Sequence, residues 1–195
     1  MNNKQPRPQI AVFTATTAAG KTTIMNEILK RYPKVTKRIV TYTTRPPRSG
    51  EIHGVHYYFC SRESFEARIR DGRFIEWATV YGNYYGTYTI SIFDALEQED
   101  VTTFISLDVQ GHLILRAYDF IPKESILSIF IDVPPKQLRA RLVARGEEPA
   151  VIERRLKKAT MERAQRKNFD IVINNANGRL HQAIQETIGV LGLDD

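Results

Sequence analysis

One junction near the start of the chain limits the folds that this sequence can adopt. A short apolar run at residues 10–13 is followed by the small polar segment ATTAAGKTT at residues 15–23, and then by apolar residues at helical spacing. The apolar run predicts a buried strand, and the pattern after it predicts a helix that ends before Pro33. A strand that turns directly into a helix presents several backbone N–H groups, which can surround an anion. The junction therefore predicts an anion-binding loop.

The same junction matches the Walker A pattern, with Ala15 in place of the first glycine and Gly20-Lys21-Thr22 at the end. In such a loop the lysine reaches the β- and γ-phosphates of ATP, and the hydroxyl of Thr22 holds Mg²⁺. The alternative is an ordinary strand–helix turn of small residues. If Ala15 has a positive φ, it costs about 1 kcal/mol relative to glycine. The residues expected to bind ATP here are Ala15, Thr16, Thr17, Ala18, Ala19, Gly20, Lys21, Thr22 and Thr23.

Strand-like and helix-like segments alternate along the rest of the chain. We expect strands at residues 38–43, 102–107, 126–133 and 170–174, and helices at 61–71, 90–98, 135–145, 150–167 and 178–191. This alternation favours an α/β fold with a mostly parallel sheet. Residues 44–89 break the rhythm, because they are rich in glycine, proline and aromatic residues. They predict a small insertion of short, twisted strands.

The composition is that of a folded protein with an excess of positive charge. The chain has 195 residues, of which 42% are hydrophobic, and its formal net charge is +6. A mostly disordered chain is therefore excluded. The single Cys60 excludes an intrachain disulfide and a cysteine zinc cluster. Because no apolar run reaches the ~20 residues of a membrane span and no secretory signal is present, we expect a cytoplasmic protein with no membrane partner.

The positive charge has three interpretations: a nucleic-acid surface, a site for a small anionic substrate, or a solubilising surface. A local motif favours the second. Arg45 and Arg48 lie three residues apart across a rigid Pro-Pro pair. Two oriented guanidinium groups together with tyrosine hydroxyls suit a phosphate dianion, and Tyr57 and Tyr85 are candidates for the hydroxyls. Taken alone, the motif is equally typical of a solvated basic loop beside structural aromatics.

Five sequence blocks in a fixed order carry a resemblance to a known family. They are TTRPPR at 43–48, GEIHGVHYYF at 50–59, FIEWA at 74–78, GNYYGT at 82–87 and LDVQG at 107–111. Together with the loop at 15–23, this set resembles the guanylate kinases over about residues 10–191. The resemblance implies transfer of the γ-phosphate of ATP to GMP, and also to dGMP, with Mg²⁺ accompanying ATP. The basic residues would then serve two mononucleotides, so we expect no nucleic-acid partner.

The resemblance also implies the domain organisation. It predicts one guanylate-kinase-like domain over residues 1–195, with the three-layer fold of P-loop NTPases. Its core would be residues 8–40, 90–134 and 158–195. A mixed-β GMP-binding insertion is expected at 41–89, and a helical lid at 135–157. The oligomeric state stays open between monomer and homodimer.

By the same resemblance, one group of residues holds the acceptor nucleotide. The GMP phosphate would be bound by Arg45, Arg48, Tyr57 and Tyr85. Glu76 would recognise the guanine, and threonine hydroxyls would complete the contacts to the base. The full set expected to bind GMP is Thr41, Arg45, Arg48, Tyr57, Glu76, Tyr85, Thr87, Ser106, Asp108 and Arg155.

The assignment of Glu76 to guanine agrees with its chemistry. Guanine presents its N1–H and N2–H₂ groups side by side as donors, and an ionised carboxylate offers two acceptors at a matching separation. Adenine has an acceptor at N1, which a carboxylate repels. A site built on such a pair discriminates between bases by several orders of magnitude. Taken alone, Glu76 is also typical of a surface glutamate beside a tryptophan.

The predicted lid supplies further cations. Arg141 and Arg145 are four residues apart and therefore lie on one face of a helix. By resemblance they would contact ATP, Arg155 would lie between the two nucleotides, and Asn174 would lie near adenine. The alternative is an amphipathic helix with a solvated arginine face. The residues expected to act in catalysis are Lys21, Arg45, Arg141, Arg145 and Arg155.

Three departures from the family pattern define the rival hypotheses. Besides Ala15, Ala18 replaces a usual glycine, and Ser106 stands where the family carries an acid. These changes favour a non-catalytic or impaired binding module with a guanylate-kinase-like fold. A kinase for another nucleoside or sugar phosphate is a second rival, which Glu76 disfavours. The presence of Lys21 and Thr22 favours the enzyme.

Overall fold

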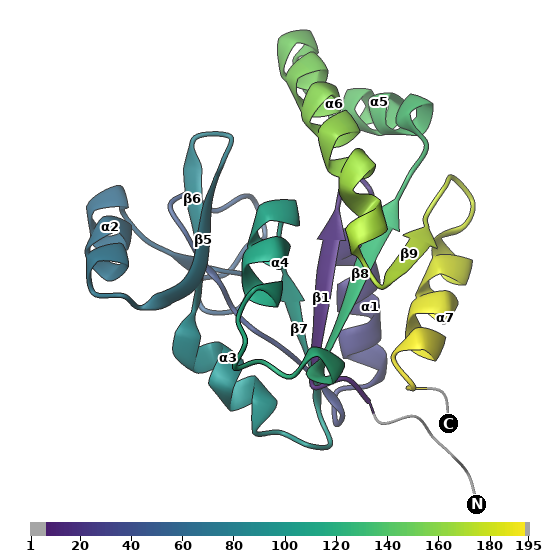
Figure 1. The fold of residues 1–195 in the computed structure, drawn as a ribbon. Helices are drawn as coiled ribbons and strands as arrows, with labels where there is room; N and C mark the ends of the chain where they lie inside the picture. Colours follow the sequence, from purple (N-terminus) through teal and green to yellow (C-terminus); the bar gives the residue numbers. More distant parts are fainter. Residues whose placement is uncertain (1–6, 194–195) are drawn as a thin grey trace, which may run out of the picture.

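The computed structural model describes residues 7–193, and its core is a five-stranded sheet (Figure 1). The strands are β1 (Ile10–Ala15), β2 (Thr36–Arg38), β7 (Thr102–Ser106), β8 (Ile126–Asp132) and β9 (Ile171–Asn174). Their order across the sheet is β2-β7-β1-β8-β9, and every neighbouring pair is parallel. The predicted α/β fold with a parallel sheet is thus confirmed. All five carboxyl ends meet at one edge, where open α/β sheets bind their ligands.

Helices cover both faces of this sheet. Along β1, Ala11 and Phe13 pack into a core with α1 (Lys21–Arg31) and α7 (Leu180–Val190). The alternate residues Ile10 and Val12 pack into a second core with α3 (Thr89–Leu96) and α4 (Val109–Arg116). Because a strand that is buried on both faces needs apolar residues at every position, the uninterrupted run at 10–13 is explained. The result is the predicted three-layer arrangement.

A second sheet lies to one side of the first (Figure 1). Its order is β4-β3-β6-β5, formed by β3 (Tyr42–Thr43), β4 (Tyr58–Phe59), β5 (Phe74–Val80) and β6 (Asn83–Tyr88). The β3–β4 pair is parallel and the other two pairs are antiparallel, so the sheet is mixed. Helix α2 (Arg62–Arg70) accompanies it, and the ring of Phe65 stacks on that of Phe74 at a centroid distance of 4.4 Å. Aromatic residues of the insertion thus pack against one another and hold its helix on its sheet.

One predicted strand is wrong, because the structure divides residues 38–43 between the two sheets. Arg38 ends β2, which pairs with β7 in the parallel sheet, whereas Tyr42 begins β3, which pairs with β6 in the mixed sheet. Between them the Ile39 backbone N–H still donates to the carbonyl of Phe104 at 2.9 Å. A continuous β-forming run cannot reveal such a change of sheet, because both halves have the same local preference.

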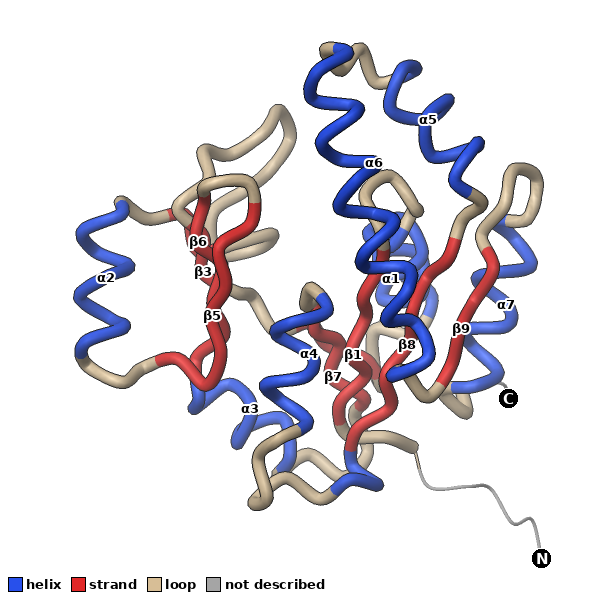
Figure 2. Tube along the Cα trace, turned by 45° about the horizontal axis from the view of Figure 1, so that its top comes forward, coloured by secondary structure: helices blue, strands red, loops and turns tan. Residues whose placement is uncertain are grey.

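Two helices form an arm beyond the carboxyl end of β8, as both views show (Figure 2). They are α5 (Pro135–Ala144) and α6 (Pro149–Ala164), each with proline in its first turn. Helix α6 runs through residue 157, where the lid was predicted to end, and stops before the expected residue 167, because residues Gln165–Asn168 form a 3₁₀ turn. A second 3₁₀ turn spans Lys123–Ser125. Helix α4 was not predicted. Within residues 7–193, no helix is both long and apolar enough to span a membrane.

Candidate active site

A cavity of about 340 Å³ opens at the carboxyl edge of the parallel sheet, between the loop after β1, the second sheet and the arm. It brings together most of the residues that the sequence predicts. These are the loop residues 15–23 with Thr41, Arg45, Arg48, Tyr57, Glu76, Tyr85, Ser106, Asp108, Arg145 and Arg155. Among the described residues, three predicted ones lie outside this lining, namely Thr87, Arg141 and Asn174.

The phosphate loop is held by a residue from the far end of the chain. Gly20 caps α1 with a left-handed φ of 89°, and a side chain at this position would overlap the amide nitrogen of Asn175. That amide donates a hydrogen bond to the carbonyl of Ala19 at 2.7 Å. Asn175 is buried directly after β9. The loop therefore depends on glycine at position 20 both for backbone conformation and for space.

The strain in the loop lies at Ala18 rather than at Ala15. Ala15 is the last residue of β1, with ordinary strand geometry, so the concern about its φ is wrong. Ala18 has a φ of 60°, in the left-handed region that disfavours residues with a Cβ. Strand β1 continues two residues beyond the apolar run at 10–13. The alanine that carries a conformational cost is the one that replaces the usual family glycine within the loop.

We expect Ala18→Gly to stabilise the protein. Relief of the left-handed alanine gains about 1 kcal/mol, and the greater freedom of glycine in the unfolded chain offsets part of this gain. Thermal unfolding should show a midpoint raised by about 1–3 °C. Ala19→Gly is the matched control, because Ala19 is buried with an ordinary φ; its midpoint should fall. A lower midpoint for Ala18→Gly would contradict the assignment of strain.

Lys21 is a desolvated cation at the start of α1. Its ammonium donates a hydrogen bond to the hydroxyl of Ser106 at the end of β7. Burial lowers its pKa to about 8, and the carboxylates of Glu162 and Asp108 oppose this decrease. Where the family carries an acid, this chain thus offers Lys21 a neutral hydroxyl. The lysine remains mostly charged at pH 7, and anionic phosphate would add to the compensation that these two carboxylates give it.

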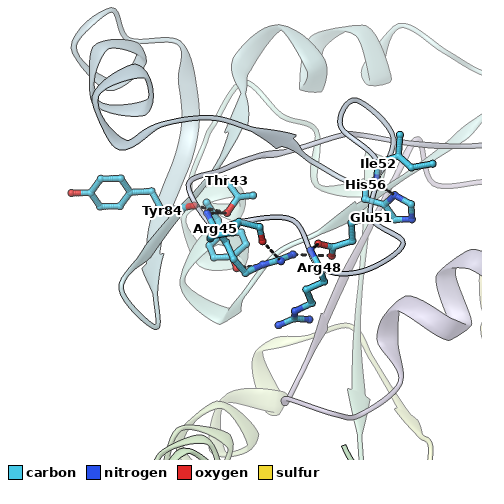
Figure 3. Close-up of polar contacts among 9 residues, drawn as sticks. Thr43, Arg45, Arg48, Glu51, Ile52, His56 and Tyr84 are labelled. Atoms are coloured by element: carbon cyan, nitrogen blue, oxygen red, sulfur yellow. Dashed lines mark hydrogen bonds and ion pairs between the residues drawn. The ribbon is translucent and has the colours of Figure 1, made fainter.

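The arginine loop of the second sheet is pre-ordered by a carboxylate (Figure 3). The guanidinium of Arg45 lies 2.8 Å from a carboxylate oxygen of Glu51 and donates to the hydroxyl of Tyr85 at 3.2 Å. The other oxygen of Glu51 accepts the backbone N–H of Arg48 at 2.7 Å. Arg45 also lies over the ring of Tyr57, 5.5 Å from its centroid. The exposed Arg48 side chain extends away from Glu51, so it remains available to an anion.

Glu76 is a buried carboxylate on β5, only 6% exposed. The hydroxyl of Thr87 on the neighbouring strand β6 donates to it. Burial raises its pKa to about 7, and the hydrogen bond from Thr87 and the negative charge of Asp108 are smaller influences. A Cβ at Gly111 would lie 2.8 Å from its second carboxylate oxygen, so α4 packs closely against it. Thr87 therefore contacts Glu76, and it does not face the cavity as a base contact.

Asp108 influences the charge of the same carboxylate, and Thr41 lines the same cavity. The side chain of Asp108 caps α4 by accepting the backbone N–H of Gly111 at 2.9 Å. One of its oxygens is 3.9 Å from the ammonium of Lys158. Thr41 is buried in the segment that joins the two sheets and lines the cavity. Backbone position thus brings these residues together from three elements.

The arm brings two of the predicted arginines to the main cavity. Arg155 on α6 donates to the hydroxyl of Thr17 at 3.3 Å, and its Nε is 2.9 Å from a carboxylate oxygen of Glu147. Arg145 lines both the main cavity and a second hollow, of about 450 Å³, behind the phosphate loop. Arg155 therefore reaches from the arm directly to the loop.

Arg141 lines that second hollow, where it donates to the carbonyls of Ala18 at 3.2 Å and Asn175 at 2.8 Å. It also donates to the side chain of Asn177. Asn174 is exposed and bonds the backbone of Ala176, so Asn175 and Asn177 line the hollow in its place.

Several residues that line the cavity were not predicted from the sequence, among them Arg38, Tyr81, Lys158 and Glu162. Lys158 and Glu162 lie on α6 at offsets of three and seven from Arg155, which places all three on one helix face. That spacing from Arg155 could have identified Lys158 and Glu162 as site residues from the sequence. Burial raises the pKa of Glu162, which lies 3.4 Å from Lys158. Arg38 and Tyr81 carried no local signal, because only the fold brings them to the cavity.

The shifted pKa values of Glu76 and Lys21 predict a bell-shaped dependence of the reaction rate on pH. Glu76 must be ionised to accept guanine donors, so kcat/KM for GMP should rise as pH increases through about 7. Lys21 must be protonated to bind phosphate, so kcat/KM for ATP should fall as pH increases through about 8. Ser106→Asp should shift the second limb to higher pH, because a carboxylate stabilises the ammonium. Initial rates measured over about pH 6–9 check this, and an unchanged second limb in the variant would contradict it.

The parts of the site define a class of protein. A phosphate loop follows the central parallel strand, an inserted sheet carries an arginine pocket and a buried carboxylate, and a helical arm brings arginines to the same cavity. Among proteins with this loop, such a second pocket facing the phosphate site is typical of kinases that phosphorylate small acceptors. The fold and the site together define a P-loop kinase of the nucleoside monophosphate type.

Comparisons with known proteins identify the family. The family model for guanylate kinase matches residues 7–188. The guanylate kinase of Neisseria gonorrhoeae is 41% identical over 169 residues, covering 85% of this chain and 79% of the relative. That of Chlamydia felis is 36% identical over 170 residues, covering 86% and 80%. The crystal structure of guanylate kinase from Anaplasma phagocytophilum superposes with a TM-score of 0.74 at 29% identity, covering 95% of this chain and 85% of that one. The chain belongs to the guanylate kinase family.

Proposed function

We propose that this protein transfers the γ-phosphate of ATP to GMP, giving ADP and GDP, and that it also accepts dGMP. The observation that carries the proposal is a single cavity lined both by the phosphate loop and by the buried carboxylate of Glu76. The first binds a phosphate donor, and the second matches the paired donors of guanine. Membership of the guanylate kinase family supports the same reaction.

The acceptor site divides into a phosphate part and a base part. We assign the GMP phosphate to Arg45, Arg48, Tyr57 and Tyr85, which meet around Glu51 on one side of the cavity. We assign the guanine to Glu76, with the Thr41 hydroxyl for its O6. Thr87 orients the carboxylate from behind. Ser106 and Asp108 lie between the base site and Lys21, with Ser106 bound to that lysine.

The ATP site is assigned to the phosphate loop and the second hollow behind it. The backbone of the loop and Lys21 face the phosphates, and the hollow lined by Arg141, Arg145, Asn175 and Asn177 would take the adenosine. Asn174 is one residue removed from this lining, so any contact from it to adenine depends on its exposed side chain. Arg155 bonds the loop from the arm and stands between the donor and acceptor sites.

The oxygen donors around the loop suit magnesium. Thr22, the second residue of α1, lines the cavity together with the carboxylates of Asp108 and Glu162. Hydroxyl and carboxylate oxygens are ligands that Mg²⁺ takes, usually with several of its waters retained. The ion arrives with ATP and would neutralise phosphate charge. We assign the direct protein ligand to Thr22.

The residues of the cavity suit a reaction that depends on positioning and charge neutralisation. The second pKa of a phosphate monoester is about 6, so the GMP phosphate is mostly a dianion at pH 7 and needs no general base. Lys21, Arg45 and Arg155 hold the two phosphates in line and offset the charge of the moving phosphoryl group. Closure of the arm excludes water, which prevents loss of ATP to hydrolysis.

A coupled assay of ADP release tests the proposal against its rivals. We expect turnover with GMP, slower turnover with dGMP, and rates lower by several orders of magnitude with AMP, CMP and UMP. Preferred turnover with another acceptor would favour a kinase for a different nucleotide. Binding of GMP, measured by calorimetry, without turnover of any acceptor would favour a non-catalytic module handicapped by Ser106.

A further inference from the structure

Tyr81 has a backbone conformation that a tyrosine rarely adopts. It forms a two-residue turn with Gly82 at the tip of the β5–β6 hairpin, where Val80 pairs with Asn83. The φ values of the two turn residues are 50° and 81°, so both are left-handed. Such turns favour asparagine or aspartate at the first position and glycine at the second. The bulky aromatic at position 81 is therefore strained, and strain of this kind gathers at functional sites.

The ring of Tyr81 faces three cations of the arm. The charged groups of Arg154, Arg155 and Lys158 on α6 lie 5.6, 5.3 and 5.1 Å from its centroid. These distances are within the range of cation–π attraction. The hairpin belongs to the second sheet, whereas α6 belongs to the arm, and Tyr81 itself lines the cavity. One side chain thus joins the acceptor side of the cavity to the arm.

Arg155 is the one of these three cations that also reaches the phosphate loop. Its guanidinium contacts three different segments: the Tyr81 ring at 5.3 Å from the centroid, the Glu147 carboxylate at 2.9 Å and the Thr17 hydroxyl at 3.3 Å. A guanidinium is planar, so an aromatic face and a carboxylate together fix both its tilt and its rotation. Removal of the ring leaves the tilt of the plane uncontrolled.

We infer that Tyr81 is a positioning residue that holds the guanidinium of Arg155 over the phosphate loop when the acceptor sheet and the arm come together. This inference rests on the proposed function, in which Arg155 stands between donor and acceptor phosphates. It gives the hairpin a part in the reaction although the hairpin touches neither reacting atom. It also explains the tyrosine at a turn position that asparagine would occupy with less strain.

The experiment compares a substitution that removes the aromatic ring with one that keeps it. Tyr81→Asn keeps the turn and removes the ring, so the thermal midpoint should stay the same or rise. Its kcat should fall by about ten- to a hundredfold while KM for GMP changes by less than about threefold, since misplacement of a catalytic group acts on the chemical step. Tyr81→Phe keeps the ring and should retain kcat within about threefold. Phe93→Leu, an exposed aromatic on α3 outside the cavity lining, is the control and should leave both constants unchanged.

Two results with the single variant Tyr81→Asn would overturn the inference: an unchanged kcat, or a parallel loss of midpoint and kcat, which marks a merely structural role. A double-mutant cycle tests the contact without turnover. The effects of Tyr81→Asn and Arg155→Ala on thermal unfolding should be non-additive, and additive effects would also overturn the inference. If the unmodified protein phosphorylates no acceptor, the proposed function fails, and the cycle alone then decides whether Tyr81 holds Arg155.

Discussion

Replacement of Glu76 by glutamine is expected to abolish the preference for GMP while leaving the fold intact. The amide keeps the size of the carboxylate, but it presents one acceptor and one N–H₂ group. Either the N1–H or the N2–H₂ of guanine then meets a donor instead of an acceptor, in a site that excludes water. A mismatch of this kind in a site built for hydrogen bonding lowers kcat/KM by about 10³-fold or more.

The same substitution, Glu76→Gln, should increase the stability of the folded protein. The pKa of Glu76 is raised to about 7 because the charged form is desolvated. Above that pH the folded protein carries a buried charge that the unfolded chain solvates freely, and a neutral amide removes this penalty. Kinetics with GMP and AMP, together with thermal unfolding at about pH 8, check both statements. Glu124→Gln, at an exposed glutamate in the 3₁₀ turn before β8, is the control. An unchanged GMP-to-AMP ratio would remove Glu76 from the base site.

Replacement of Lys21 by methionine is expected to reduce kcat by about 10³-fold or more. The ammonium is the cation of the phosphate loop closest to the transferred group in the proposed reaction, and loss of one such preorganised charge costs two to three orders of magnitude. The methionine side chain fills the same space beside Ser106 without a charge. Binding of GMP, which uses other residues, should change little.

The same variant should be more stable than the original protein. Burial lowers the pKa of Lys21 to about 8, which means that the folded state disfavours its charge. Removing that charge should increase the free energy of unfolding by roughly 3 kcal/mol near neutral pH. Lys30→Met, at an exposed position of the same helix, controls for the change of residue type. A variant that loses both activity and stability would show that Lys21 supports the loop itself.

The sequence predicted those features of the fold that depend on local patterns. The strand, loop and helix at residues 10–31 were predicted from spacing, and the parallel sheet from the alternation of elements. The division of residues 38–43 between two sheets was not predicted, because Arg38 and Tyr42 differ only in their partners. Helix α4 was missed because its first turn contains Gly111, a poor helix former, and its apolar residues 113–115 are continuous, which does not distinguish a helix from a strand.

The candidate site followed the same rule. The arginine loop and Glu76 were found from sequence blocks, since each block is continuous along the chain. Asn175, which holds the phosphate loop, and Glu162, which influences Lys21, act across more than 130 residues, and no local pattern reports such a contact. Ala18 was recognised as a departure, but its left-handed φ became visible only where the end of β1 was known.

The place of β1 in the middle of the sheet has a consequence for biosynthesis. Ile10 pairs with Thr103 on one side and with Ile126 on the other, so β1 needs partners that are synthesised much later than itself. At roughly 5–20 residues per second, an apolar segment waits about 5–20 s for its first neighbour. Such long-range parallel pairing is slow to form and prone to aggregation during the wait. Strand β1 is therefore the part of this chain that chaperone binding during translation should protect most.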